Sequence, residues 1–450
     1  MIGLNKIGLN QVQLNRLRLN APFPTCREMA GGGGSGDGFP QLPGDVTRWY
    51  FGGLTNEMMA AMDDPRIEDA DHKGRFLSFK NFAWKEGSGI SDVYPGALVF
   101  DGVDDYGVCE NFPILTKEKE YTVVALRQWD QDFLNTTLTG GLLSTRNYST
   151  GEGVAFEKIE SSNKAYWNLG AGGIIDFAKS PFTWQTSKQY NNVGILKGDK
   201  NHGKPLCVGC GLSGGQQCGR FAIWELVFLD HDATEEELNK IKDYFVKTYP
   251  WLFPDQAWTV VGKTNEDEDR ATIANITGNG NDLVCLNLGF IEGSGYNEEG
   301  EYAGYLVTDG VDDKITSSTF EMGNDWTVIG DWELINTGKN DNAGIVKFDS
   351  IVIYNYNPIL INIKNGRNNL IPDQNTVNAI CSDGRIYSKD WKESIYNEET
   401  ESTSKNLLTI GYSGNSYTKI AFKNLAIYPT VLSKEDCIKA YNYLQTLKAK

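Results

Sequence analysis

The sequence has no long apolar run. No stretch approaches the roughly eighteen consecutive apolar residues that a helix needs to cross a bilayer, so we expect no membrane insertion. Residues 1–20 also lack the continuous apolar segment of a secretory signal, and ordinary export is not expected.

Positive charge is scarce as well. The 450 residues contain 42 Lys and Arg against 59 Asp and Glu, which gives a net charge of −17. Nucleic-acid binding needs clustered Lys and Arg to neutralise phosphates. We therefore expect no nucleic-acid partner, and the acidic balance favours solubility at high local concentration.

The eight cysteines do not form a repeated framework, because most lack a counterpart in the duplicated part of the chain. Free thiols in a reducing compartment are therefore predicted. Cys207, Cys210 and Cys218, with His202 upstream, have the residue types of a Cys₃His zinc site. Adjacent strand positions point to opposite faces, which favours buried thiols and leaves zinc as an alternative.

What the sequence does contain is a long internal repeat. The segment 99–105, Val-Phe-Asp-Gly-Val-Asp-Asp, returns about two hundred residues later as Val-Thr-Asp-Gly-Val-Asp-Asp at 307–313. Two further pairs match in the same order: Glu-Gly-Ser-Gly at 86–89 and 292–295, and Thr-Asn-Glu at 55–57 and 264–266. A period this long indicates a duplicated domain rather than a solenoid unit.

Each copy has the composition of a β domain. The 49 glycines and 12% aromatic residues suit short strands joined by many turns. Each copy closes with an apolar strand and a short helix, whose starts are marked by Thr234 with Glu237 and by Ser433 with Asp436. We predict one domain over residues 45–253 and a second over 254–450. Both are expected to consist mainly of strands.

A different repeat, of period five, occupies the N-terminus. Four units of the pattern apolar-x-Leu-Asn place two apolar residues on one face of a short extended piece. The eight apolar residues of this predicted anchoring arm are Ile2, Leu4, Ile7, Leu9, Val12, Leu14, Leu17 and Leu19. One such coil cannot bury eight large side chains alone, so it needs a partner surface from sister chains or a larger assembly.

The arm also differs from the rest of the chain in charge. Residues 1–27 contain Lys6, Arg16, Arg18 and Arg27 and no Asp or Glu. We predict an anchoring arm over 1–29 and a Gly-rich tether over 30–44. A disordered tail is the alternative, but disorder rarely carries so regular an apolar pattern.

The repeated segments resemble a known fold family. An apolar strand leading into Phe-Asp-Gly-Val-Asp-Asp, followed by an apolar-Thr-Val strand and a capped C-terminal helix, resembles the concanavalin A-like lectin/glucanase fold of laminin-G type. The resemblance covers about residues 45–450, as two modules. It implies two jelly-roll β-sandwiches, and it says little about function, because the fold hosts lectins, adhesins and hydrolases.

The whole layout, with its arm, tether and tandem modules, looks like a fibre or decoration protein of crAss-like phages that infect Bacteroides. This resemblance implies a virion protein made in the bacterial cytoplasm, a head fibre ahead of a tail fibre. It implies capsid or other virion proteins as partners of the arm, a homo-oligomer (a trimer ahead of a dimer) and weak glycan binding. A bacterial surface adhesin is a further alternative.

A glycoside hydrolase of the same fold is another alternative. Glucanases of this type carry Glu-x-Asp-x-Glu on one strand, and neither copy contains that motif. Glu225 stands alone, with Asn424 at the matching place, and His72 and His231 have no nucleophile at a recognisable spacing. We therefore expect no enzymatic activity, no catalytic residues and no cofactor.

Two binding roles stay open at this point. Asp101 and Asp105, like Asp309 and Asp313, could bind calcium, but Asp and Gly are also what a tight turn between strands requires. The turn role is favoured. Five tryptophans could stack on sugar rings, although a place in the core is favoured for them: Trp84, Trp129, Trp167, Trp332 and Trp391.

Overall fold

The fold is described from a computed structural model. It describes residues 38–112, 120–145, 155–158, 164–167, 175–176, 182–186, 205–212, 215–335, 344–348, 351–354, 359–363, 367–371, 377–395, 406–412 and 416–449. The predicted arm, with all eight of its apolar residues, and most of the tether lie outside these ranges. No helix among the described residues is long and apolar enough to cross a membrane.

The chain divides into two compact units. The first comprises the described residues up to Tyr244, apart from 93–95, and the second begins at Phe245. The sequence-based boundary between 253 and 254 lies slightly further along the chain. The domain limits otherwise stay a prediction.

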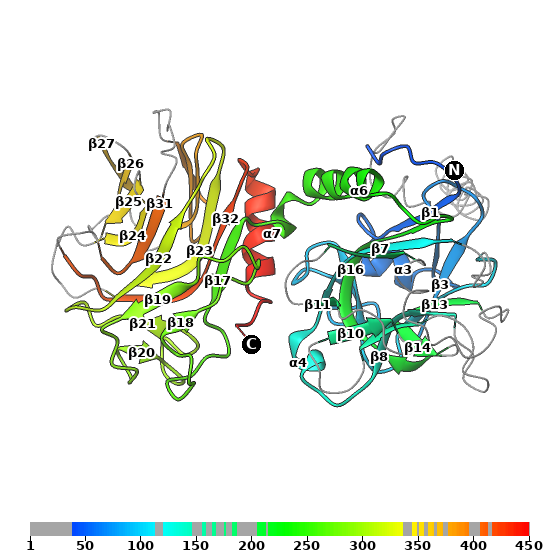
Figure 1. Ribbon diagram of the computed structural model, residues 1–450, viewed down its shortest axis with the longest axis horizontal. Coiled ribbons are helices and arrows are strands. Elements are labelled where there is room, and N and C mark those ends of the chain that lie inside the picture. Colours follow the sequence, from blue (N-terminus) through cyan, green and yellow to red (C-terminus); the bar gives the residue numbers. More distant parts are fainter. Residues whose placement is uncertain are drawn as a thin grey trace, which may run out of the picture. The chain divides into compact units, whose positions relative to one another are not determined.

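Two sheets build the first unit (Figure 1). The first sheet has the order β12 (Phe182–Thr186), β7 (Thr122–Trp129), β16 (Arg220–Leu229), β5 (Ala97–Asp101) and β4 (Gly89–Ser91), and β1 (Val46–Tyr50) also pairs with β16. The second has the order β11 (Ile175–Asp176), β10 (Lys164–Trp167), β9 (Ala155–Lys158), β8 (Gly140–Ser144), β13 (Leu206–Val208), β6 (Tyr106–Cys109), β3 (Phe76–Lys80) and β2 (Arg66–Glu68), with the hairpin β14 (Cys210–Leu212) and β15 (Gln216–Cys218) attached at β8.

The second unit repeats this plan. Its first sheet has the order β20 (Gly295–Tyr296), β21 (Leu306–Val307), β32 (Ile420–Tyr428), β23 (Thr327–Leu334), β28 (Val377–Cys381), β29 (Arg385–Ser388) and β30 (Glu393–Ile395), and β17 (Gln256–Thr259) also pairs with β32. Its second sheet has the order β18 (Thr272–Ile273), β19 (Leu283–Leu286), β22 (Lys314–Phe320), β31 (Asn406–Ile410), β24 (Gly344–Phe348), β25 (Ile351–Tyr354), β26 (Ile359–Ile363) and β27 (Arg367–Ile371).

The strand orders of the two units correspond strand by strand, and the copies share even an irregularity. The long closing strand slips by one residue against its neighbour at Trp224 in the first unit and at Lys423 in the second. Among the residues that the structure describes, the first sheet of the second unit differs by the hairpin β29–β30. A duplicated, mainly antiparallel β-sandwich, as predicted, is therefore the architecture.

Apolar side chains from both sheets of a unit meet in one core, which is what makes each unit a sandwich. In the first unit, Trp49 of β1 packs with residues of both sheets, and Trp258 of β17 does the same in the second. Both indoles are fully buried. They hold equivalent places, since Trp49 pairs with Leu226 and Trp258 with Leu425.

Short helices lie between the strands or follow the last one: α3 (Asn56–Ala60), α4 (Gln131–Leu134), α6 (Glu235–Thr248), the 3₁₀ turn η1 (Pro250–Leu252) and α7 (Lys434–Leu444). Both predicted caps of the closing helices are present. The Thr234 hydroxyl accepts from the Glu237 amide at 3.3 Å, and the Glu237 carboxylate accepts from the Thr234 amide at 2.8 Å. At α7, the Ser433 hydroxyl accepts from the Asp436 amide at 3.1 Å.

The repeated Gly of the turn motif has a steric requirement that can be tested. Gly310 has φ of +77°, and a Cβ there would lie 2.9 Å from the backbone nitrogen of Lys419. Gly304 has φ of +81° but open space around it. We expect Gly304→Ala to lower the free energy of unfolding by about 1 kcal/mol from backbone strain, and Gly310→Ala to lower it clearly further. Urea unfolding of the two variants measures the difference, and equal losses would contradict the close approach.

Candidate functional site

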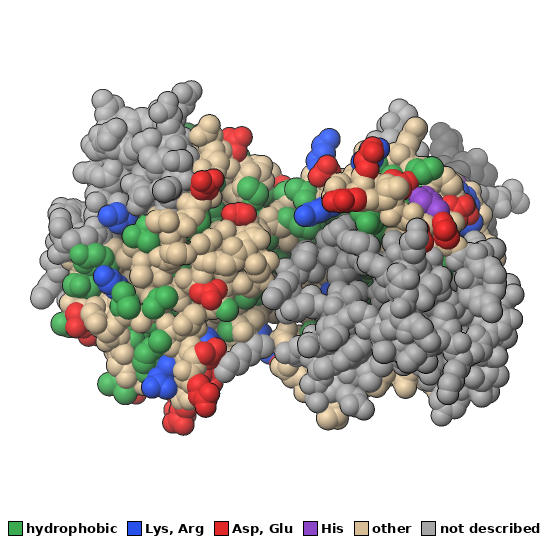
Figure 2. Space-filling model, in the orientation of Figure 1, with side chains coloured by type: hydrophobic (Ala, Val, Ile, Leu, Met, Phe, Trp, Pro, Cys, Tyr) green, Lys and Arg blue, Asp and Glu red, His purple; other side chains and the backbone are tan. Residues whose placement is uncertain are grey.

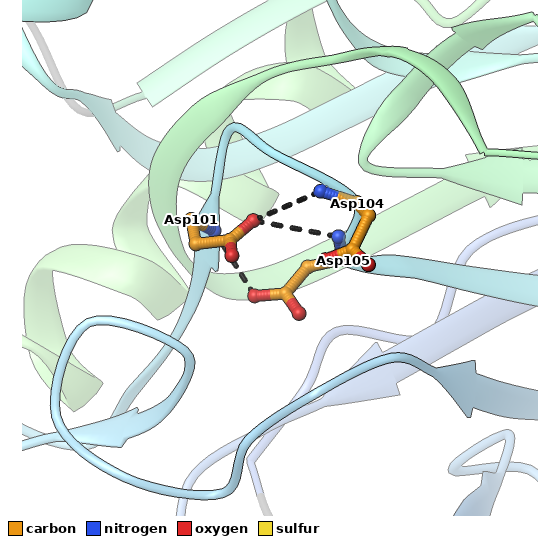
Figure 3. Close-up of side chains that lie close together, drawn as sticks. All are labelled: Asp101, Asp104 and Asp105. Carbon is orange, nitrogen blue, oxygen red and sulfur yellow. Dashed lines mark hydrogen bonds between the residues drawn. The ribbon is translucent and has the colours of Figure 1, made fainter.

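The repeated Asp-Gly-Val-Asp-Asp segment forms the turn between β5 and β6 (Figure 3). A carboxylate oxygen of Asp101 accepts hydrogen bonds from the amides of Val103 at 2.8 Å, Asp104 at 3.3 Å and Asp105 at 3.4 Å. An aspartate that accepts from the amides just after it closes a tight turn. The sequence of this segment is therefore first of all a turn sequence.

Asp105 is the buried residue of this turn. Its side chain has no exposed surface, and its carboxylate accepts from the Asp101 amide at 3.1 Å and from the Ser88 hydroxyl at 3.1 Å. Burial raises the pKa of Asp105 to about 7, although the Ser88 hydrogen bond acts in the opposite direction. The residue joins the turn to the segment that carries Ser88.

The second unit has the same arrangement. Asp309 accepts from the amide of Val311 at 2.7 Å, and Asp313 accepts from the Asp309 amide at 2.8 Å and the Ser294 hydroxyl at 2.7 Å. Burial raises the pKa of Asp313 as well. Ser88 and Ser294 belong to the repeated Glu-Gly-Ser-Gly segments, so two of the landmarks in the sequence bond to each other in space.

Metal binding is the other chemistry that this site offers. In each unit, three carboxylates (Asp101, Asp104 and Asp105, or Asp309, Asp312 and Asp313) bring oxygens within 4.8 Å of one another, and such oxygens suit Ca²⁺. The turn amides and the serine hydroxyl already bond to the first and last carboxylate of each set. Turn formation therefore accounts for these positions, and calcium binding stays a hypothesis.

The third repeated landmark is also structural. The Asn56 amide group donates to the carbonyl of Ile90 at 2.8 Å and accepts from the amide of Ile90 at 2.8 Å. Asn265 forms the same pair of bonds with Tyr296, at 2.7 Å each. The shared residues thus bind the chain to itself.

The first unit contains a buried ionic cluster. Arg48 donates to Tyr244 at 2.9 Å and lies 3.4 Å from the carboxylate of Glu225, which accepts from the Tyr244 hydroxyl at 3.0 Å. All three side chains are less than 8% exposed. The strand pairing confirms that Asn424 corresponds to Glu225, because Leu126 pairs with Glu225 as Asp331 pairs with Asn424.

Sequence analysis singled out Glu225 but missed Arg48 and Tyr244. One feature of the sequence could have pointed to Arg48: it is the charged residue in β1, whose other four residues carry no charge. A surface cavity of about 410 Å³ lies beside it, lined by Phe39, Asp71 and Lys73 among others. The Phe39 ring lies 4.5 Å from the guanidinium carbon of Arg48, which helps to shield the cluster from water.

The prediction of free thiols is wrong for one pair. Cys207 and Cys210 form a disulfide with a Cα–Cα distance of 6.2 Å, well within the range that disulfides span. The reason is local. Gly209, with φ of +92°, bends the chain between β13 and β14. Strand pairing places Thr409 of the second unit where the first has Cys207. Because no second cysteine pair occurs there, comparison of the copies gave no signal.

The remaining thiols that the structure describes are buried, as predicted: Cys109, Cys218, Cys285, Cys381 and Cys437. Cys218 packs against the disulfide, and burial raises the pKa of its thiol to about 12. His202, the fourth ligand of the zinc alternative, lies outside the described residues. Since the disulfide occupies two of the three sulfurs, the described geometry favours a packing role.

The other two histidines, His72 and His231, pair with acidic side chains. His231 lies 3.0 Å from the carboxylate of Glu237 and 3.3 Å from that of Asp230. Burial lowers the pKa of His231, but these two carboxylates outweigh it and raise the pKa overall. His72 lies 3.3 Å from Glu68 on the surface. Charge pairing accounts for both.

The tryptophans are mostly core residues, as the sequence analysis favoured. Trp129 and Trp332 are each 1% exposed, and Trp84 packs against the core of the first unit. The side chain of Trp167 lies outside the described residues. Trp391 differs from these, because it is half-buried at the surface with φ of +56°.

Charge on the surface is mixed. Figure 2 shows Asp and Glu side chains scattered over the visible face of both units, with Lys and Arg side chains interspersed. The coloured residues on this face, which are those that the structure describes, do not form the broad basic surface that phosphate backbones require.

Comparison with known proteins gives distant matches. No family model and no curated protein matches the sequence. Among solved structures, a Trypanosoma rangeli sialidase aligns over 86% of this chain and 69% of its own, with 9% identity and a TM-score of 0.33.

Two toxin domains also align. The receptor-binding domain of botulinum neurotoxin type G aligns over 42% of this chain and 50% of its own, with 12% identity and a TM-score of 0.27. The binding domain of serotype D aligns over 80% of this chain and 94% of its own, with 10% identity and a TM-score of 0.30. At such scores these matches carry no functional argument, and the β-sandwich assignment rests on the sheets themselves.

The raised pKa of Asp105 predicts a pH-dependent stability. The folded chain holds this proton more tightly than the unfolded chain, whose Asp has the ordinary value of 3.8. The extra stability is therefore complete below that value and is lost as the pH rises through about 7. Asp105→Asn stays neutral, so wild type should lose stability relative to this variant between about pH 4 and pH 8.

Urea unfolding at a series of pH values measures this difference. Asp104→Asn, in the exposed middle of the turn, is the matched control and should follow the wild type. A constant difference between wild type and Asp105→Asn would show that Asp105 titrates normally.

The buried ionic cluster can be tested by giving the first unit the residues of the second. Arg48→Ala leaves the buried Glu225 carboxylate without its guanidinium, and we expect a loss of about 3 kcal/mol in the free energy of unfolding. Adding Glu225→Asn, the residue at the matching place, removes that buried charge. The double variant should therefore be more stable than the sum of the single losses implies, as measured in a double-mutant cycle; strictly additive losses would contradict the pairing.

Proposed function

We propose that this chain is a non-enzymatic structural protein of a phage virion, a head fibre or capsid decoration that displays two β-sandwiches. The observation that carries the proposal is what the two units share. Asp105, Ser88 and Asn56, with their counterparts, bond to backbone or to one another and build the scaffold. Shared residues that serve chemistry would instead direct polar atoms to a common open site.

The residues that could serve chemistry differ between the units. Glu225 is replaced by Asn424 at the matching place, and the Cys207–Cys210 disulfide has no equivalent in the second unit. Duplication kept the scaffold and let the rest diverge. This supports a spacer or display element, in which the number and size of modules matter more than one conserved reaction.

In this proposal, residues 1–29 attach the protein to the capsid or to another virion protein. The chain is a homo-oligomer, with a trimer favoured, and it is made in the cytoplasm of the host bacterium. The displayed modules bind glycans weakly. Several copies on one particle convert weak single contacts into firm adhesion, because each further contact forms at a high effective concentration.

The anchoring role is tested in the full-length chain. Replacing Leu4, Leu9, Leu14 and Leu19 with Ser removes half of the apolar pattern and should abolish co-sedimentation with particles that lack the protein. The circular dichroism spectrum should not change. Gln11→Ser with Gln13→Ser is the control outside the apolar pattern and should still bind. Undiminished binding of the four-serine variant would refute the anchoring role.

A further inference from the structure

A half-buried aromatic patch lies on the second unit beside α7. It consists of Tyr302, Tyr305, Trp391 and Tyr441. Trp391 and Tyr441 meet edge to face, with ring centres 5.7 Å apart at 82°, and Tyr302 and Tyr305 do so at 6.4 Å and 81°. An edge-to-face contact covers one face of one ring only. The ammonium of Lys423 also lies 5.7 Å from the centre of the Tyr305 ring.

The carboxylate of Asp331 joins the two ring pairs. It accepts a hydrogen bond from the Tyr305 hydroxyl at 3.0 Å and another from Tyr441, and the ammonium of Lys423 lies 3.9 Å away. Asp331 is only 8% exposed. Burial, with this carboxylate, raises the pKa of both tyrosines, so their hydroxyls stay donors.

The hairpin β29–β30 presents Trp391. Its ring lies 6.2 Å from that of Tyr387, which is fully buried and forms the floor of the patch. The Trp391 amide donates to the Ser388 carbonyl at 2.9 Å, which holds the turn in its left-handed conformation. Lys389, in the same turn, pairs with Glu333 of β23 and ties the hairpin to the sheet.

The patch is not part of the duplicated scaffold. Strand pairing and the helix caps place Ala97, Leu126 and Lys242 of the first unit where the second unit has Tyr305, Asp331 and Tyr441. The hairpin that carries Trp391 has no counterpart in the described part of the first unit. Tyr305, Asp331 and Tyr441 therefore have no aromatic or acidic counterparts at the matching positions of the first unit.

We propose that this patch binds a neutral pyranose of a glycan, with Trp391 as the platform on which the sugar ring stacks. The inference rests on the proposed display function and names the site for it. A pyranose has a face of C–H groups that packs on an aromatic ring and a rim of hydroxyls that needs hydrogen bonds. Here the rings supply the surface, and the groups of Glu333 and Lys389 beside them supply an acceptor and a donor.

The chemistry of the patch favours a sugar over a protein partner. Asp, Glu and Lys are depleted at the centres of protein interfaces, whereas this patch has Asp331, Glu333, Lys389 and Lys423 among its rings. The charges pair off as Lys389 with Glu333 and Lys423 with Asp331. The patch therefore has no surplus of positive charge to attract an anionic sugar, which is why we propose a neutral one.

The experiment titrates the full-length protein with neutral oligosaccharides of glucose, mannose, galactose or xylose, by calorimetry and by ligand-observed NMR. Wild type should bind at least one member of this panel. Trp391→Ala should weaken that binding at least about tenfold, and Trp391→Tyr, which keeps a ring, should restore most of it. Thermal unfolding checks that each variant is folded.

A matched pair of variants covers the case in which Trp391→Ala does not fold. Tyr302→Ala, which leaves Asp331 in place, should weaken binding. Tyr106→Ala, which removes a half-buried tyrosine ring from the first unit, should not.

Each other outcome overturns the inference. Binding that neither Trp391→Ala nor Tyr302→Ala weakens places the glycan site elsewhere and leaves the display function standing. Binding of only an acidic sugar or a protein by the wild type, or of no ligand at millimolar concentration, refutes a neutral glycan at this patch. Particle attachment through the arm is measured separately, so failure here does not decide it.

Discussion

Each unit depends on one buried carboxylate, that of Asp105 in the first and Asp313 in the second. A carboxylate can be buried only if donors replace the water that it loses. Those donors are the amide at the start of the turn and the hydroxyl of Ser88 or Ser294. The turn, the serine segment and the strands on either side are therefore held in one arrangement, and the landmarks that repeat in the sequence are the parts of this contact.

The space between the first sheet and the closing helix is filled by different side chains in the two units. In the first unit it holds Arg48, Glu225 and Tyr244 as a buried ionic cluster. In the second unit, Cys437 of α7 and Cys381 of β28 contact each other there, both fully buried. The comparison shows that this layer accommodates different side chains without a change in the strand order of the sheet beneath it.

Interactions between residues close together in the sequence could be predicted, whereas interactions between distant residues could not. The helix caps at Thr234 and Ser433 and the Asp-Gly-Val-Asp-Asp turns are local, since donor and acceptor lie within four residues, and the sequence predicted them. The equivalence of Glu225 and Asn424 was also accessible, because the repeat itself supplies the alignment. Arg48 with Tyr244 was not, because its partners lie more than a hundred residues away and the second copy offers no parallel.

A comparison of the two copies does not identify the residues of the aromatic patch. Tyr305 directly precedes β21, Asp331 lies in β23 and Tyr441 in α7. Trp391 lies in the turn of the hairpin β29–β30. Each residue taken alone resembles an ordinary strand, turn or helix position, and only the fold brings them together. An alignment of the two copies highlights what the scaffold needs. The residues that distinguish a displayed module are those that such an alignment leaves unmatched, and in the second unit two of them, Tyr305 and Tyr441, meet at one carboxylate, that of Asp331.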